Sequence, residues 1–190
     1  MSVIFTEGFE TDGNGTRYTT SVAEFSDTFG DFFTRTDGTN TGTFYTVTSV
    51  SGSWYFAAMD TNGDGGPTTA SLQIDDIDIT GVTDLGFTGL FAEDDDGSNQ
   101  DWDADALVYV EARIDNGAWV KILQFAGTGT NTEPQLDTDF DGVGDGAALT
   151  DDLTEYTAAI AGTGAELDLR VTIENLEAGD EDIAFDDLSI

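Results

Sequence analysis

The segment Leu167-Asp168-Leu169-Arg170-Val171-Thr172-Ile173 alternates strictly between apolar and polar residues. A period of two places the apolar side chains on one face of an extended strand and the polar side chains on the other. Residues 106–114 alternate in the same way, and Asp115-Asn116-Gly117 separates them from a third apolar-rich segment, residues 118–125. An Asn-Gly pair between two strands is a strong hairpin signal. These segments therefore predict an antiparallel β-sheet.

Short strand-like segments recur along the rest of the chain, between stretches rich in Gly, Asn, Asp and Thr. They cover residues 3–9, 17–25, 32–36, 44–50, 54–59, 71–79, 85–91 and 183–190. The apolar parity changes across Asp75-Asp76, which predicts a β-bulge, and we expect a helical turn within residues 147–160. About ten or more strands without a repeat predict an all-β, two-sheet antiparallel sandwich of jelly-roll type. No linker divides the sequence, so we expect one domain over residues 1–190.

The composition is strongly acidic. The 190 residues include 39 aspartates and glutamates but only 5 lysines and arginines, which gives a net charge of −34, and there is no histidine or cysteine. Such a charge argues against a nucleic-acid partner or an anionic membrane. Without cysteine the chain has no thiol nucleophile, and without histidine it lacks the usual general base, so we expect a protein that is not an enzyme. The expected partner of so many carboxylates is a hard cation.

Two acidic segments match the beginning of a calcium-binding loop. Asp60-Thr61-Asn62-Gly63-Asp64-Gly65 has the pattern D-x-N-x-D-G, and Asp137-Thr138-Asp139-Phe140-Asp141-Gly142 has the pattern D-x-D-x-D-G. Alternate side chains of a tight loop converge on one point, and the glycine permits the sharp turn. Neither loop has the glutamate that completes an EF-hand, so an ordinary acidic turn is the alternative. The candidate calcium ligands are Asp60, Asn62, Asp64, Asp137, Asp139, Asp141 and Asp145.

A third acidic segment, residues 93–105, lies between two predicted strands, and long loops of this kind often carry binding functions. Its candidate metal ligands are Glu93, Asp94, Asp96, Asp101, Asp103 and Asp105. Trp102, with Asn99 and Asp101 beside it, is the candidate contact to a bound ligand. The alternative is a solvated loop in which Trp102 folds back onto the core.

The two ends of the chain provide a fourth candidate metal site. Glu7 and Glu10 follow the first apolar residues, and Asp186 with Asp187 interrupts the apolar pattern of the last strand. Adjacent acids in an apolar strand are costly unless they are paired or bound to a metal. The five basic residues are too few to neutralise all of these carboxylates.

The terminal segments Phe5-Thr6-Glu7-Gly8-Phe9-Glu10 and Ile183-Ala184-Phe185-Asp186-Asp187-Leu188-Ser189-Ile190 resemble the terminal strands of calcium-bound jelly-roll modules. Carbohydrate-binding modules and MAM-type domains belong to that group. There, an acid after the first Phe and another near the last strand help to hold a structural calcium. The resemblance therefore implies a pair formed by Glu10 and either Asp187 or Asp186.

The chain as a whole, with residues 93–105 and 137–145, is similar to modules of large secreted bacterial proteins such as RTX-type adhesins and multidomain extracellular nucleases. In some adhesins a calcium-rich sandwich domain binds a peptide or sugar through an exposed calcium. The RTX nonapeptide repeat itself is not present in this sequence. The resemblance implies several calcium ions and a peptide or carbohydrate partner on a cell surface.

These observations predict an extracellular, secreted or cell-surface module that binds a ligand in a calcium-dependent manner. Residues 1–5 do not have the composition of a signal peptide. Export is inferred instead from calcium, because millimolar-class sites stay empty at cytosolic calcium concentrations. The main alternative is a calcium-rigidified structural module, either a spacer or a self-associating filament subunit. Glycosidase-like carboxylate catalysis and ice binding through the threonines of residues 34–48 are weaker alternatives. We expect Trp119 to pack in the core or across strands rather than to stack on a sugar.

Overall fold

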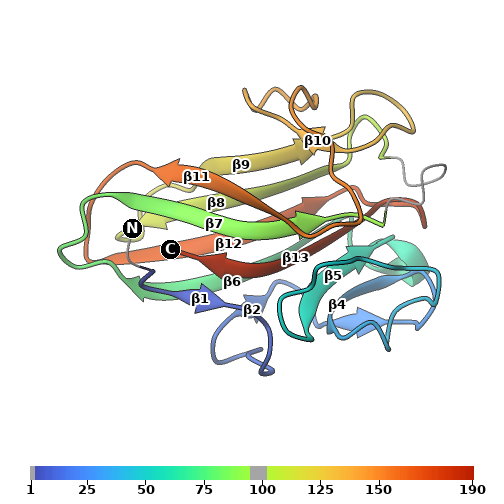
Figure 1. Cartoon of the computed structure of the whole chain (residues 1–190), viewed down its shortest axis with the longest axis horizontal. Helices are drawn as coiled ribbons and strands as arrows, with labels where there is room; N and C mark the ends of the chain where they lie inside the picture. Colours follow the sequence, from blue (N-terminus) through green and yellow to red (C-terminus); the bar gives the residue numbers. More distant parts are fainter. Residues whose placement is uncertain (1–2, 95–101) are drawn as a thin grey trace.

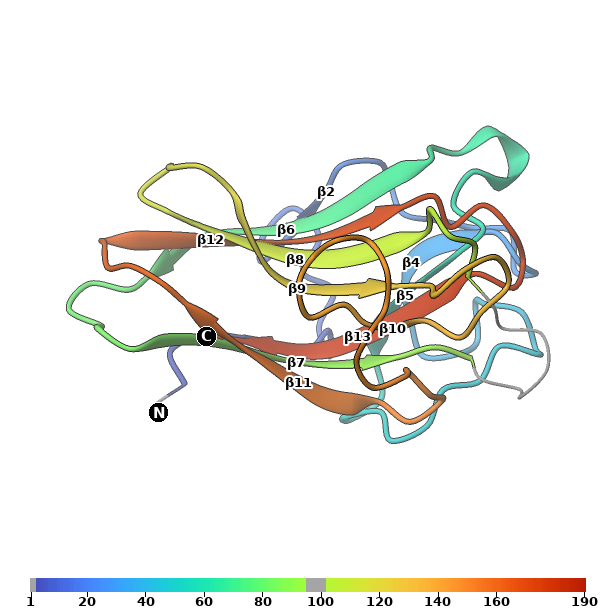
Figure 2. The same cartoon turned by 90° about the horizontal axis from the view of Figure 1, so that it is seen from above.

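The computed structural model describes residues 3–94 and 102–190, and in these residues the chain forms two antiparallel β-sheets packed face to face (Figure 1, Figure 2). The seven-stranded sheet has the order β11-β7-β13-β5-β4-β3, with β1 paired to β13. The six-stranded sheet has the order β10-β9-β8-β12-β6-β2. The predicted two-sheet antiparallel sandwich is confirmed.

The seven-stranded sheet consists of β1 (Thr6–Glu7), β3 (Phe25–Ser26), β4 (Phe32–Thr36), β5 (Tyr55–Met59), β7 (Leu85–Ala92), β11 (Thr154–Ile160) and β13 (Asp182–Ser189). The six-stranded sheet consists of β2 (Thr19–Thr20), β6 (Thr69–Asp78), β8 (Leu107–Ile114), β9 (Val120–Ala126), β10 (Gln135–Leu136) and β12 (Glu166–Glu174). A three-residue 3-10 helix, η1 (Gly63–Gly65), follows β5. None of the described residues forms a helix long and apolar enough to span a membrane.

The alternating segments form the centre of the six-stranded sheet. β12 pairs with β8 on one side and with β6 on the other, and the β12–β6 register shifts between Leu167 and Leu169, opposite the predicted bulge. The β8–β9 hairpin also forms. Asp115 and Asn116 have φ values of 50° and 57°, and the N–H of Gly117 donates to the carbonyl of Ile114 at 2.9 Å. Two left-handed residues give the turn the twist that antiparallel strands need.

The main core lies between the two sheets. Phe185 of β13 is fully buried there, and its ring stacks on Phe56 of β5 with centroids 5.2 Å apart. The rings of Phe9 and Phe91 lie 5.9 and 6.2 Å from it. Leu169 of β12 faces these rings from the other sheet as part of the same cluster. The apolar positions of the alternating strands thus meet in one layer.

A second apolar cluster covers the outer face of the seven-stranded sheet. Tyr45, with Val47 and Val50, packs onto Phe32 and Ala184, which point away from the main core. The rings of Phe32 and Tyr45 lie 5.0 Å apart. The connection between β4 and β5 therefore shields this face from water, including the polar residues of β13 beneath it.

Two predictions of secondary structure were wrong. Residues 44–50 form no strand, because their apolar side chains pack onto the sheet face while the backbone makes only an isolated bridge between Thr48 and Asp152. Residues 147–160 contain no helical turn, and β11 occupies their second half. Pairing of β11 along the whole of β7 outweighs the local helical preference of its alanines.

Replacing Phe185 by Ala should lower the free energy of unfolding by about 3–5 kcal/mol, because it leaves a cavity among three aromatic rings. Urea unfolding of the purified chain measures this loss. Val120→Ala is the control, since Val120 is 60% exposed and should change stability by less than about 0.5 kcal/mol. Similar losses in the two variants would contradict this description of the core.

Candidate functional site

The acidic loop that follows β10 brings three predicted ligands together. Carboxylate oxygens of Asp137, Asp139 and Asp141 all lie within 4.8 Å of one another, with Asp137 buried and the other two exposed. Gly142 ends the motif with φ at 90°, a conformation that favours glycine and permits the sharp turn. Asp145, the fourth predicted ligand, accepts hydrogen bonds from the backbone N–H and the hydroxyl of Thr138, at 2.9 and 3.0 Å. The loop thus offers oxygen ligands of the kind that calcium prefers.

The electrostatics of this loop favour a cation. Burial acts to raise the pKa of Asp137, but hydrogen bonds from Gly142, Gln124 and Phe140 outweigh it and lower the pKa. Asp137 therefore keeps its negative charge inside the loop. The charge of Asp141 raises the pKa of Asp139, because the two carboxylates repel each other.

A polar patch with two aromatic rings lies on the outer face of the six-stranded sheet, next to this loop. The outward side chains of β8 include Tyr109, Glu111 and Arg113, and those of β12 include Asp168 and Arg170, since Val110 and Leu169 between them point into the core. Trp119, just before β9, lies over this face. We call Tyr109, Glu111, Arg113, Trp119, Lys121, Asp168 and Arg170 the sheet-face patch.

Ion pairs hold the side chains of the sheet-face patch in place. Arg113 Nε lies 2.7 Å from Asp168 Oδ2, and Arg170 Nη2 lies 2.6 Å from Glu111 Oε2. The guanidinium carbons of Arg113 and Arg170 lie 4.6 and 4.3 Å from the ring centroid of Trp119. The expected cross-strand packing of Trp119 is therefore observed, on the outer face of the sheet rather than in the core.

Hydrogen bonds connect the sheet-face patch to the acidic loop. Lys121 Nζ lies 3.9 Å from the ring centroid of Tyr109 and donates to Gln124 Oε1 at 2.5 Å. The Nε2 of Gln124, which is fully buried, donates to Asp137 Oδ2 at 2.5 Å. The Asp137 carboxylate therefore fixes the orientation of the Gln124 amide, and this amide positions Lys121 in the sheet-face patch.

The other predicted loop lies beside η1 at the end of β5. Asp60 precedes the helix, Asn62 is its N-cap residue and Asp64 lies within it. Burial raises the pKa of Asp60 to about 6, and the charge of Asp31 and a hydrogen bond with it act in the same direction. Asp31 packs closely against Gly63, where a Cβ atom would lie 2.2 Å from its Oδ2. Asp31 is an acidic partner that the sequence analysis missed.

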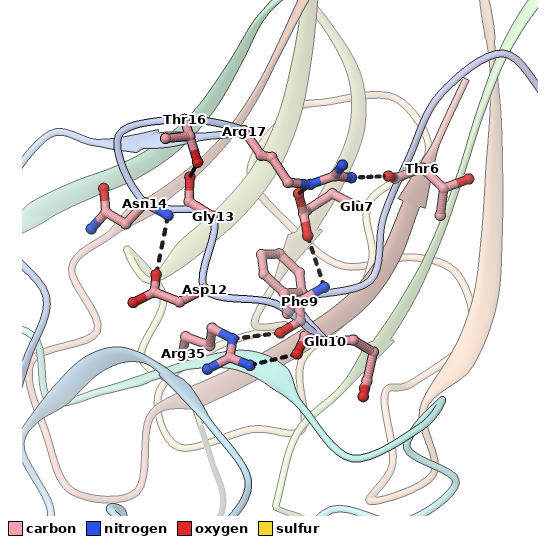
Figure 3. Close-up of polar contacts among 10 residues, drawn as sticks. All are labelled: Thr6, Glu7, Phe9, Glu10, Asp12, Gly13, Asn14, Thr16, Arg17 and Arg35. Carbon is pink, nitrogen blue, oxygen red and sulfur yellow. Dashed lines mark hydrogen bonds and ion pairs between the residues drawn. The ribbon is translucent and has the colours of Figure 1, made fainter.

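The terminal acids divide into two groups. Glu7 is buried, and its carboxylate contacts Arg17 Nε at 2.6 Å and the N–H of Phe9 at 2.9 Å (Figure 3). Glu7 was predicted as a metal ligand; in the structure Arg17 compensates its charge. On the other side of this segment, Arg35 donates to the carbonyls of Phe9 and Glu10.

Glu10 and Asp186 both accept hydrogen bonds from the backbone of residues 51–54, which lead into β5, and Asp187 follows Asp186 in β13. Glu10 Oε1 accepts hydrogen bonds from the N–H groups of Ser53 and Trp54, which lower its pKa. Asp186 is fully buried, and burial raises its pKa to about 7, to which the charges of Asp187 and Glu10 also contribute. These three acids therefore form a second place where a cation would relieve repulsion.

Residues 93–105 only partly follow the prediction. Glu93 and Asp94 are buried, while Asp96, Asn99 and Asp101 lie outside the described residues. Asp103 and Asp105 are exposed; Asp103 Oδ1 accepts the N–H of Asn131, and Asp105 contributes its backbone carbonyl to Asn175.

We correct the predicted ligand contact of Trp102. Its side chain is fully buried in the main core, and its indole N–H donates to the carbonyl of Asp182 at 3.1 Å. No face of the ring is available to a ligand. The alternative in which Trp102 folds back onto the core describes its position.

Comparison with known proteins supports the fold. The structure is similar to the K3 cleaved adhesin domain of Lys-gingipain from Porphyromonas gingivalis w83, with a TM-score of 0.52 and 12% identity over 99% of this chain and 98% of that domain. It is also similar to a carbohydrate-binding module that recognises mannan, with a TM-score of 0.44 and 12% identity over 99% of this chain and 95% of the module. A carbohydrate-binding module from Caldicellulosiruptor saccharolyticus, in complex with mannohexaose, matches with a TM-score of 0.43 and 12% identity over 100% of this chain and 95% of the module. No family model and no curated protein matches the sequence.

In the presence of a chelator that removes divalent cations, the free energy of unfolding should fall as the pH rises from about 4 to 7. The pKa of Asp186 is about 7 in the folded chain and about 3.9 in an unfolded one, so the folded chain binds more protons in this range and loses stability as they dissociate. Asp186→Asn should flatten the slope, which urea unfolding at several pH values measures. An exposed aspartate, Asp84, supplies the control Asp84→Asn; equal slopes in both variants would contradict the assignment.

Proposed function

We propose that this chain is an extracellular, calcium-dependent adhesion module that binds a glycan on the sheet-face patch. The observation that carries the proposal is the convergence of Trp119 with three of the five basic residues, Arg113, Lys121 and Arg170, on the outer face of the six-stranded sheet. Sites for small ligands combine aromatic surface with a few well-placed polar groups. The likeness in fold to an adhesin domain supports the same class of function.

A sugar suits the chemistry of this face. The guanidinium groups of Arg113 and Arg170 contact the half-buried Trp119 ring, and the exposed part of this ring would offer apolar aromatic surface to the C–H groups of a pyranose ring. Glu111, Arg113 and Lys121 supply charged acceptors and donors for hydroxyl groups. Because ion pairs already hold these side chains, binding costs little additional side-chain entropy.

The charge of the chain selects a neutral glycan over an acidic one. A net charge of −34 repels anions at long range. Within the sheet-face patch, Arg113 and Arg170 are each paired with a carboxylate, so the patch has little excess positive charge to overcome this repulsion. We therefore expect uncharged hexose polymers to bind better than uronic acid polymers.

Calcium enters the proposal through the acidic loop. An ion held by Asp137, Asp139 and Asp141 would fix the loop and thereby the hydrogen bond from Gln124 to Asp137. Gln124 in turn positions Lys121 in the sheet-face patch. Millimolar extracellular calcium fills sites of this class, which supports an extracellular location.

Trp119→Ala should abolish glycan binding in calcium while leaving the melting temperature nearly unchanged, because Trp119 lies outside the main core. Affinity electrophoresis in a panel of neutral and acidic polysaccharides measures the binding. The control is Trp54→Ala, since Trp54 also stacks on a guanidinium group, that of Arg35, at 3.6 Å, but away from this face. Equal loss in both variants would contradict the proposed site, and no binding by the native chain would favour the structural spacer.

Calcium should raise the melting temperature relative to EDTA, whereas magnesium at equal concentration should raise it less. A single site at one hundred times its dissociation constant contributes about 2.7 kcal/mol. Asp139→Ala should reduce this gain, because it removes one of three converging carboxylates. Differential scanning calorimetry measures the gain, with Asp84→Ala as the control, and an undiminished gain in Asp139→Ala would exclude the loop.

A further inference from the structure

A second group of buried acids lies on the opposite sheet, beneath the β4–β5 connection. Asp182 begins β13 and pairs with Met59 of β5, while Ala184 pairs with Ala92 at the end of β7. This antiparallel register brings Asp94 beside Asp182, and the N–H of Asp94 donates to Asp182 Oδ1 at 2.9 Å. The side chain of Asp182 points to the outer face of the sheet, as that of Ala184 does.

Asp182 has no solvent exposure, and its second carboxylate oxygen, Oδ2, has no hydrogen-bond partner among the described residues. An ionised carboxylate in such an environment costs several kcal/mol unless something compensates it. Asp94, whose N–H contacts Asp182, is 3% exposed, and Glu93, the residue before it, has no solvent exposure. Asp182 and Asp94 are therefore neighbouring acids that are both buried.

Tyr45 closes this region from the β4–β5 connection. Its side chain is buried at 4% exposure and its hydroxyl group has no partner among the described residues. Burial raises the pKa of Tyr45, and the charges of Asp182, Asp94 and Glu93 act in the same direction. The neighbouring hydroxyl of Thr46 donates to Asp94 Oδ1 at 3.1 Å.

No basic side chain compensates this group. The five lysines and arginines of the chain all have other contacts: Arg17 with Glu7, Arg35 with Trp54, Arg113 with Asp168, Lys121 with Gln124 and Arg170 with Glu111. A hard cation would compensate these carboxylates in their ionised form, and carboxylate oxygens are its preferred ligands. We infer that Asp182 and Asp94 bind a buried calcium ion.

This ion would have a different role from one in the Asp137 loop. It would join β13 to the end of β7 and hold both beneath Tyr45, which closes the apolar cover of the seven-stranded sheet. The inference rests on the calcium dependence in the proposed function but not on glycan binding, so its test counts ions rather than bound ligand.

The first experiment measures bound calcium in the full chain by equilibrium dialysis. Asp182→Asn should bind one ion fewer than the native chain, as should Asp139→Ala, and the double variant should bind two fewer, while Asp84→Asn should match the native count. An unchanged count in Asp182→Asn overturns the inference, whatever Asp139→Ala shows. If Asp139→Ala alone keeps the native count, the loop site of the proposed function fails and this inference stands.

The melting temperature of Asp182→Asn, measured in EDTA and in calcium, provides a second test, because the substitution should act in opposite directions in the two buffers. In EDTA, Asp182→Asn should melt at or above the native temperature, because it removes a carboxyl group whose ionised form is costly to bury and keeps an oxygen that accepts the Asp94 N–H. In calcium it should melt below the native chain, because the ion is lost. A variant that melts at or above the native chain in both buffers, or a native chain that gains as much from magnesium, overturns the inference.

Terbium luminescence covers the case in which Asp182→Asn does not fold. Trp102 contacts Asp182 through its indole N–H, so it should transfer excitation to a terbium ion bound there. Trp102→Phe should lose a component of the emission while binding the same number of terbium ions, and calcium should displace this component in the native chain. The control Trp54→Phe should retain it. Emission that does not depend on Trp102 overturns the inference.

Discussion

Burial of carboxylates in a chain with few basic residues is the constraint on which this structure depends. The 39 acids face 5 bases, so most buried acids must be compensated without an arginine or lysine. Glu7 uses Arg17, and Glu181 uses the N–H groups of Asp103, Glu177 and Ala178. The Asp182 carboxylate accepts one hydrogen bond, from the N–H of Asp94 to Oδ1, and its Oδ2 has no hydrogen-bond partner among the described residues. The buried acids without such partners are the places where calcium would contribute to folding, because binding to the native state alone adds directly to its stability.

The two outer faces of the sandwich solve this problem in different ways. On the six-stranded sheet, ion pairs across β8 and β12 neutralise Glu111 and Asp168, and Trp119 lies against both arginines. On the seven-stranded sheet, no base is available for Asp182, and an apolar cover excludes water above it. The placement of three bases on one sheet thus determines how each face compensates its carboxylates.

Much of the fold follows from local sequence, but the buried site does not. Strict alternation predicted the central strands, and the spacing of Asp137, Asp139 and Asp141 predicted three oxygens that do converge. Asp182 escaped notice because its partner Asp94 lies 88 residues away and meets it only through the β7–β13 register. The position of Trp102 has the same origin, since a ring in an acidic segment looks exposed until the strands around it pair. The acidic composition indicated that the chain needs cations, but it could not show which carboxylates would bind each cation.

A calcium-dependent binder and a calcium-rigidified spacer share every acidic feature of this chain, so the sheet face separates the two. The Trp119 ring contacts two paired arginines on the outer face of the six-stranded sheet and takes no part in the packing of the main core, so a spacer would not need it. A hydrogen-bonded path runs from Lys121 through Gln124 to Asp137, and Gln124 is buried, so water does not compete for its amide. Under the proposed function, calcium would act on the ligand through this path and would not need to touch it.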